Sequence, residues 1–174
     1  MTQVRDAVRE GDTGEAVPFT VRGGRAGDAH ELSFHWGEAR APSHVHVLDR
    51  YFGELGRGTQ GCHVAVWGEN GDLVGQLWTR FRNIDPAVAD GRTECYMHTM
   101  FVMDEYRRRG VARALIESAS ASAGRFGRSV MVIGVDRSNE YARELYEKWG
   151  FKAFYKTNDL RGDLIFLRRR LLEG

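Results

Sequence analysis

The sequence predicts a mixed α/β fold, in which a central sheet of six to seven strands is flanked by about four helices. Segments of period-two and helical hydrophobic spacing follow one another in the order β-α-α-β-β-β-α-β-α-β-β. A strand, a helix and another strand in the second half imply a right-handed crossover and parallel pairing. Hairpins in the first half imply antiparallel pairing, so the sheet is mixed and carries helices on both faces.

The first half begins with a polar segment, residues 1–17, which we interpret as a flexible N-terminal arm. Residues 18–174 then fit one domain of ordinary size. Residues 19–22 alternate as a strand, and Asp28 can cap a following helix. A second helix begins near Pro42 and ends at Gly56 and Gly58. The inward positions on these two helices are Leu32, Phe34 and Trp36, then Val47, Leu48, Tyr51, Phe52 and Leu55.

Residues 62–67 and 73–81 are apolar, alternating runs on either side of an Asn-Gly pair at 70–71, which predicts a hairpin. Residues 85–91 form a loop, and the next strand covers about 94–103. We expect a helix at 111–123, a strand at 130–135 and a helix at 140–148. Two final strands, near 153–156 and 164–168, are joined by a polar turn.

Composition excludes several classes of protein. The chain has 25 Lys plus Arg against 24 Asp plus Glu, a balance that argues against a dedicated nucleic-acid binder. Its two cysteines, Cys62 and Cys95, form no disulfide framework. The first residues lack the apolar stretch of a signal peptide, and no run is long enough to span a bilayer. We therefore expect a cytoplasmic protein that contacts no membrane.

The most informative segment runs from Met100 to Ala112, from an apolar strand through a charged turn into a helix. Backbone N–H groups at a helix N-terminus lack partners, and the helix dipole is positive there. Gly110 permits close approach, so the turn can cradle a pyrophosphate among three arginines. A solvated basic helix start is the alternative. The pattern is neither a Walker loop nor a dinucleotide fingerprint.

A second motif follows at residues 138–151. Ser138 or Asn139 caps a helix, and Gly150 ends it. Together, Arg-x-x-Gly-x-Ala at 107–112 and Asn-x-x-Ala-x-x-x-Tyr-x-x-x-Gly-Phe at 139–151 resemble the GNAT N-acetyltransferase superfamily, in its order and spacing. The resemblance covers about residues 94–152 and implies the GNAT fold with acetyl-CoA as co-substrate.

The resemblance assigns a cofactor-binding role to several positions. The strand before the glycine loop would bind the pantetheine arm, the loop would hold the pyrophosphate, and the second helix would contact the cofactor. These positions are Met100, Phe101 and Val102; Arg107, Arg108, Arg109, Gly110, Val111 and Ala112; and Asn139 and Tyr146. Tyr146 also matches the tyrosine that protonates the leaving thiolate in many members. Its alternative role is as a core tyrosine of an amphipathic helix.

Two residues of one strand, His98 and Glu94, are the candidates for the general base. Period-two alternation puts five residues on one face: Glu94, Tyr96, His98, Met100 and Val102. His98 has an ordinary pKa suited to a base, and Glu94 could act through water. A half-buried strand histidine is the alternative for His98, and an amine that arrives neutral would need no base. Some members carry a glutamate where this chain has Gly134.

The resemblance implies transfer of an acetyl group from acetyl-CoA to a primary amine by direct attack in a ternary complex. Cys95 lies on the other strand parity from His98, so a thiol nucleophile is not expected. No metal is expected, because His44 and His46 lack a third ligand. The second hypothesis is a non-catalytic acyl-CoA sensor. The acceptor amine stays open and can belong to a small molecule or a protein. The acyl chain length of the donor and a homodimeric state stay open as well.

Overall fold

The computed structural model describes residues 18–34, 42–68, 71–159 and 162–171. The expected N-terminal arm, Trp36 and Asn70 of the hairpin turn lie outside these residues. The strands are β1 (Phe19–Gly23), β2 (Gln60–Trp67), β3 (Asp72–Arg80), β4 (Glu94–Val102), β5 (Val130–Asp136), β6 (Lys152–Asp159) and β7 (Gly162–Arg170). The helices are α1 (Ala29–Phe34), α2 (Pro42–Gly56), α3 (Val111–Arg125) and α4 (Glu140–Lys148), with short 3₁₀ turns at Ala26–Asp28 and Asp104–Tyr106.

The strands form one mixed sheet in the order β1-β2-β3-β4-β5-β7-β6. β1 to β4 pair antiparallel, β4 and β5 pair parallel through the α3 crossover, and β6 and β7 form an antiparallel hairpin. The predicted mixed α/β fold and its parallel crossover are therefore confirmed. The position of β7 between β5 and β6 was not predicted, because no local pattern encodes which strand of a hairpin turns inward.

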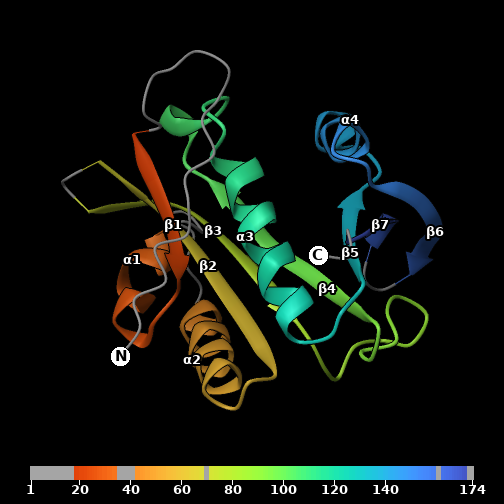
Figure 1. Ribbon diagram of the computed structural model, residues 1–174, viewed down its shortest axis with the longest axis horizontal. Helices are drawn as coiled ribbons and strands as arrows, with labels where there is room; N and C mark the ends of the chain where they lie inside the picture. Colours follow the sequence, from red (N-terminus) through yellow and green to blue (C-terminus); the bar gives the residue numbers. More distant parts are fainter. Residues whose placement is uncertain (1–17, 35–41, 69–70, 160–161, 172–174) are drawn as a thin grey trace.

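The two faces of the sheet carry different helices. Ala65 and Leu77 pack with α3 and α4 in the largest apolar cluster, whereas the next residues along each strand face α1 and α2. Figure 1 shows α3 near the middle of the molecule and α4 beside β5, β6 and β7. The alternation of each strand thus fills two cores, one on each side of a sheet that is covered on both faces.

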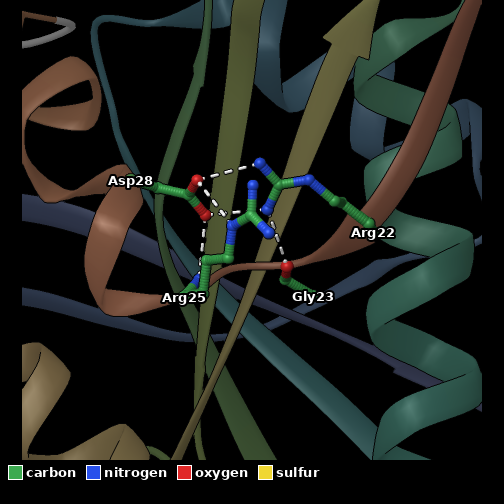
Figure 2. Close-up of polar contacts among 4 residues, drawn as sticks. All are labelled: Arg22, Gly23, Arg25 and Asp28. Atoms are coloured by element: carbon green, nitrogen blue, oxygen red, sulfur yellow. Dashed lines mark hydrogen bonds and ion pairs between the residues drawn. The ribbon is translucent and has the colours of Figure 1, made fainter. Parts of the chain in front are cut away.

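A buried carboxylate ties β1 to the turn that precedes α1. Asp28 is 6% exposed, and both of its oxygens accept hydrogen bonds of 2.8 Å from the guanidinium group of Arg22. The backbone N–H of Arg25 donates a third bond of 2.8 Å, so the carboxylate closes the turn on itself (Figure 2). The sequence predicts that Asp28 caps α1 from its own position, but its carboxylate instead accepts a hydrogen bond from the Arg25 N–H at the start of the 3₁₀ turn, of which Asp28 is the third residue.

Among the residues that the structure describes, no helix is both long and apolar enough to cross a membrane.

Candidate active site

The parallel strands β4 and β5 separate halfway along their length. Their pairing ends at Met97 and Ile133, although β4 continues to Val102 and β5 to Asp136. A cavity of about 580 Å³ lies in this region, bounded by the end of β4, the start of α3, the end of β5 and one side of α4. This cavity, which both motifs line, is thus formed where the sheet opens between parallel strands.

The N-terminus of α3 forms one wall of the cavity. Gly110 precedes the helix with φ of 84°, a left-handed conformation that glycine adopts without strain, and it has no side chain to cap the helix. The first N–H groups of α3 are therefore open to an anion. Arg107 is anchored by its Nε bond to the Val102 carbonyl, 3.2 Å, and by its ion pair with Asp104, 2.7 Å.

The three arginines of the glycine turn have different surroundings. Arg107 and Arg108 line the cavity together with Gly110, Val111 and Ala112. The guanidinium group of Arg109 instead lies 5.4 Å from the centre of the Trp67 ring on β2, a cation–π contact. Arg109 does not line the cavity. Of the residues expected to bind the cofactor in this turn, it is the one whose position favours that contact least.

The helix α4 supplies both of its expected residues. Asn139 caps the helix, because its Oδ1 accepts a bond of 3.1 Å from the Ala142 N–H, and it also lines the cavity. Tyr146 lines the cavity from the middle of α4 and is 6% exposed. Burial, with a smaller contribution from Tyr96, raises the pKa of Tyr146 above its ordinary value. Its hydroxyl therefore keeps its proton at neutral pH.

A bulge in β4 corrects the predicted alternation of that strand. From Trp78 to Gln76, β3 advances two residues, while β4 advances three, from His98 to Phe101. Thr99 has φ of 52° at this point. The expectation that Glu94, Tyr96, His98, Met100 and Val102 share one face is wrong, because one extra residue reverses the side on which later side chains lie. Met100 and Val102 pack in the α3 cluster with Cys95 and Met97.

His98 lies on the α2 face with both ring nitrogens engaged. Its Nε2 lies 2.9 Å from the Gln60 Oε1, and its Nδ1 lies 3.0 Å from the Thr99 hydroxyl oxygen. Burial, reinforced by Arg80 and Arg50, lowers the pKa of His98 to about 3. The ring lines the cavity, but it is neutral at pH 7 and a weak proton acceptor.

Glu94 and Cys95 lie away from the cavity. Glu94 begins β4, where the strand is still paired with β5, about 17 Å along the strand from Thr99. It lies 3.9 Å from Arg168 as an ion pair and accepts a bond from the Asp90 N–H, 3.2 Å. Cys95 is fully buried against α3, and burial raises the pKa of its thiol to about 12. Direct action of either residue on a substrate in the cavity is therefore not favoured.

Gly134 lies on β5 in the cavity wall. A Cβ atom there would lie 3.0 Å from the Tyr96 hydroxyl oxygen and 3.0 Å from a ring carbon of Phe166. The two aromatic side chains thus occupy the space that a larger residue would need. Alternation along β4 predicts the face on which Tyr96 lies. Its contact with Gly134 could not be predicted, because it depends on the parallel pairing of β4 with β5.

Sequence reasoning missed the part played by Gln60, which contacts His98 although the two residues are 38 positions apart in the sequence. It also missed Tyr141, which lines the cavity from α4, and Trp149, which lines it from the residue directly after that helix. In the described ranges, no group of three or more His, Cys, Asp or Glu side chains is placed to hold a metal. The side chains of His44 and His46 lie outside the description.

A family model described as the acetyltransferase (GNAT) family matches residues 29–151. The chain belongs to the GNAT acetyltransferase family. The family is one of acyltransferases, and both motifs lie within the matched residues.

Solved structures share the fold at low identity. An N-acetyltransferase from Staphylococcus aureus Mu50 is 20% identical with a TM-score of 0.73, covering 88% of this chain and 99% of its own. A putative acetyltransferase from Salmonella typhimurium, solved with its cofactor acetyl-CoA, is 21% identical with a TM-score of 0.70, covering 90% and 96%. A phosphinothricin acetyltransferase from Sinorhizobium meliloti, in complex with acetyl-CoA, is 21% identical with a TM-score of 0.71, covering 90% of each chain. No curated protein matches the chain.

Proposed function

We propose that the protein is an N-acetyltransferase that moves the acetyl group of acetyl-CoA to a primary amine by direct attack in a ternary complex. The observation that carries this proposal is the cavity between β4 and β5, which has the uncapped N-terminus of α3 in one wall and the Tyr146 side chain in another. Acetyl-CoA would supply the acyl group as a thioester, whose C–S bond breaks as the C–N bond forms and whose sulfur leaves with one proton.

The residues of the cavity fit the parts of such a donor. The open N–H groups after Gly110, with Arg107 and Arg108 beside them, suit a pyrophosphate. Met100, Phe101 and Val102 line the cavity on the edge of β4 that has left β5, where backbone groups can bind an amide-containing arm. Asn139 and Ala142 complete the wall on α4. Arg109 is assigned to the support of the turn, through Trp67, and not to the donor.

Tyr146 is the proposed general acid. Its side chain is buried, lines the cavity and keeps its proton because burial raises its pKa. A phenol held in this way can give a proton to a leaving thiolate and regain one, through water, from the nitrogen that has attacked. The backbone N–H groups of the bulged part of β4 are the proposed donors to the carbonyl oxygen as it gains negative charge.

No side-chain base is assigned to the amine. His98 uses both nitrogens within the protein, and Glu94 lies in the closed part of the sheet. We therefore propose that the amine reacts from its neutral form, which it reaches by losing a proton to water. Turnover should then rise with pH in the range set by the amine's own pKa, and amines of different basicity should give different profiles.

Calorimetric titration with acetyl-CoA, followed by a thiol-release assay against a panel of amines, tests the proposal. Binding with release for one class of amine is expected, and that class would name the acceptor. Absence of binding would contradict the proposed function.

The engaged His98 ring favours a second candidate, a non-catalytic acyl-CoA sensor. Binding without release for any amine would be the result expected of that sensor.

A further inference from the structure

The bulge of β4 places a strained residue in the wall of the cavity. Thr99 lines the cavity and has φ of 52°, a left-handed backbone that a β-branched residue rarely adopts. Such a conformation persists only where surrounding groups hold it in place. The groups that hold Thr99 therefore help to set the shape of the cavity wall.

Three side chains form a hydrogen-bonded chain that ends on Thr99. Glu54 lies in α2 and accepts a hydrogen bond from the Gln60 Nε2 at the start of β2. The Gln60 Oε1 lies 2.9 Å from the His98 Nε2. The His98 Nδ1 lies 3.0 Å from the Thr99 hydroxyl oxygen. The chain thus runs from a helix on one face of the sheet to the strained position in β4.

The direction of each bond follows from the carboxylate at its start. An ionised carboxylate only accepts, so the amide nitrogen of Gln60 faces Glu54 and the amide oxygen faces His98. The His98 Nε2 must then carry the proton. Its Nδ1 is left with a lone pair, which accepts the Thr99 hydroxyl. The neutral ring has one tautomer that satisfies both neighbours.

Two aromatic rings and a buried amide contact the His98 ring. Gln60 is 2% exposed. The Tyr51 ring meets the His98 ring at 5.0 Å edge to face, and the Tyr96 ring stacks on it at 6.1 Å. Arg80 lies 3.9 Å from the Glu54 carboxylate and holds it near Gln60. These contacts limit the positions open to the His98 ring, so its hydrogen bonds can hold the ring and the Thr99 hydroxyl in one arrangement.

We propose that His98 is a positioning residue, through which Glu54 and Gln60 hold the Thr99 hydroxyl and keep the β4 bulge in the shape that binds the acyl donor. The proposal rests on the proposed function, since it concerns the donor site of that reaction. It gives His98 a role that does not require it to take up a proton. It also accounts for a histidine that lines the cavity while both of its nitrogens are used elsewhere.

A double-mutant cycle tests the chain. His98→Ala should weaken acetyl-CoA binding about tenfold, the loss expected of one hydrogen bond that supports the site. In the Thr99→Gly background, the left-handed backbone needs no support. His98→Ala should there change acetyl-CoA affinity by less than about twofold. The effects of the two substitutions would then not add, which is the sign that the two residues are coupled. The same coupling should appear in urea unfolding of the four proteins, which needs no ligand.

Two matched pairs separate positioning from other roles. Thr99→Ser keeps the hydroxyl and should retain affinity, whereas Thr99→Val keeps the shape, loses the hydroxyl and should behave as His98→Ala does. His98→Asn keeps an acceptor near Thr99 and should recover part of the affinity without changing the pH profile of turnover.

Equal losses from His98→Ala in both backgrounds, by binding and by unfolding, would overturn the proposal. So would His98→Asn if it retained affinity but removed a limb of the pH profile, since that result marks a base. If the unchanged protein bound no acetyl-CoA, the proposed function would fail, while the unfolding cycle would still decide whether His98 holds Thr99.

Discussion

Replacing Gly134 with alanine should destabilise the protein, because the new methyl group meets two aromatic side chains. The Cβ atom would lie 3.0 Å from the Tyr96 oxygen and from a Phe166 ring carbon, against 3.4 Å for the start of ordinary contact, so both rings must give by a few tenths of an ångström. Overpacking of this kind costs about 1–3 kcal/mol. Alanine recovers about 0.4–1 kcal/mol through the unfolded chain, which leaves an expected net loss of about 1 kcal/mol.

Thermal unfolding of Gly134→Ala should therefore show a melting temperature about 2–4 °C lower. Gly124→Ala is the matched control, because Gly124 lies in α3 with no atom within 4 Å of the added methyl group. That substitution should stabilise the protein by about 0.5–1 kcal/mol. In a Tyr96→Phe background, the loss from Gly134→Ala should shrink, since one of the two contacts is removed. A melting temperature that is unchanged or higher in Gly134→Ala would refute the packing of these rings over β5.

Tyr146→Phe should lower thiol release about 100-fold or more while acetyl-CoA affinity, measured by calorimetry, stays within about twofold; equal turnover would remove the general-acid role. Asp28→Asn should cost about 1.5–3 kcal/mol in urea unfolding, because two bonds from Arg22 lose their charged acceptor. Burial opposes a low pKa for Asp28, but bonds from Arg22 and the Arg25 amide outweigh it and lower that pKa. The stabilisation is therefore present above about pH 4 and lost as pH falls through the lowered value, a dependence that the variant should lack. Burial, assisted by Arg125, lowers the pKa of His63 to about 4, so the unfolded chain takes up a proton that the folded chain does not. His63 alone should make stability fall by up to about 1.4 kcal/mol per pH unit from about pH 6.5 to 4, and His63→Gln should reduce the slope by that amount; identical slopes would contradict it.

The elements of this fold were predictable because their signals are local. Hydrophobic periodicity placed each described strand and helix within a few residues, as in the helix predicted at 111–123 and found at Val111–Arg125. The two motifs were equally readable, since Gly110 and Asn139 act on the backbone of their own turns. Their order and spacing resemble those of the GNAT superfamily, and that family is confirmed by the family match over residues 29–151.

The role of β4 could not be predicted in the same way. Alternation predicted that His98 and Met100 share a face, and a single bulged residue at Thr99 reversed that relation. The bulge itself depends on pairing with β3, which is a contact between strands. Arg109 is expected at the donor for the same local reason as Arg107, whereas its cation–π contact with Trp67 depends on a strand that is distant in the sequence.

The sequence by itself determined the helices, the strands and the glycine turn, because each depends on residues within one turn or one strand of each other. The family entered through the resemblance of its two motifs, each of them local. Only the tertiary structure decided which side chains meet at the cavity. Gln60 reaches His98 across 38 residues, and Tyr96 reaches Gly134 from the neighbouring strand. Such contacts are set by strand register and by the point at which β4 and β5 part, and neither is encoded in a local pattern.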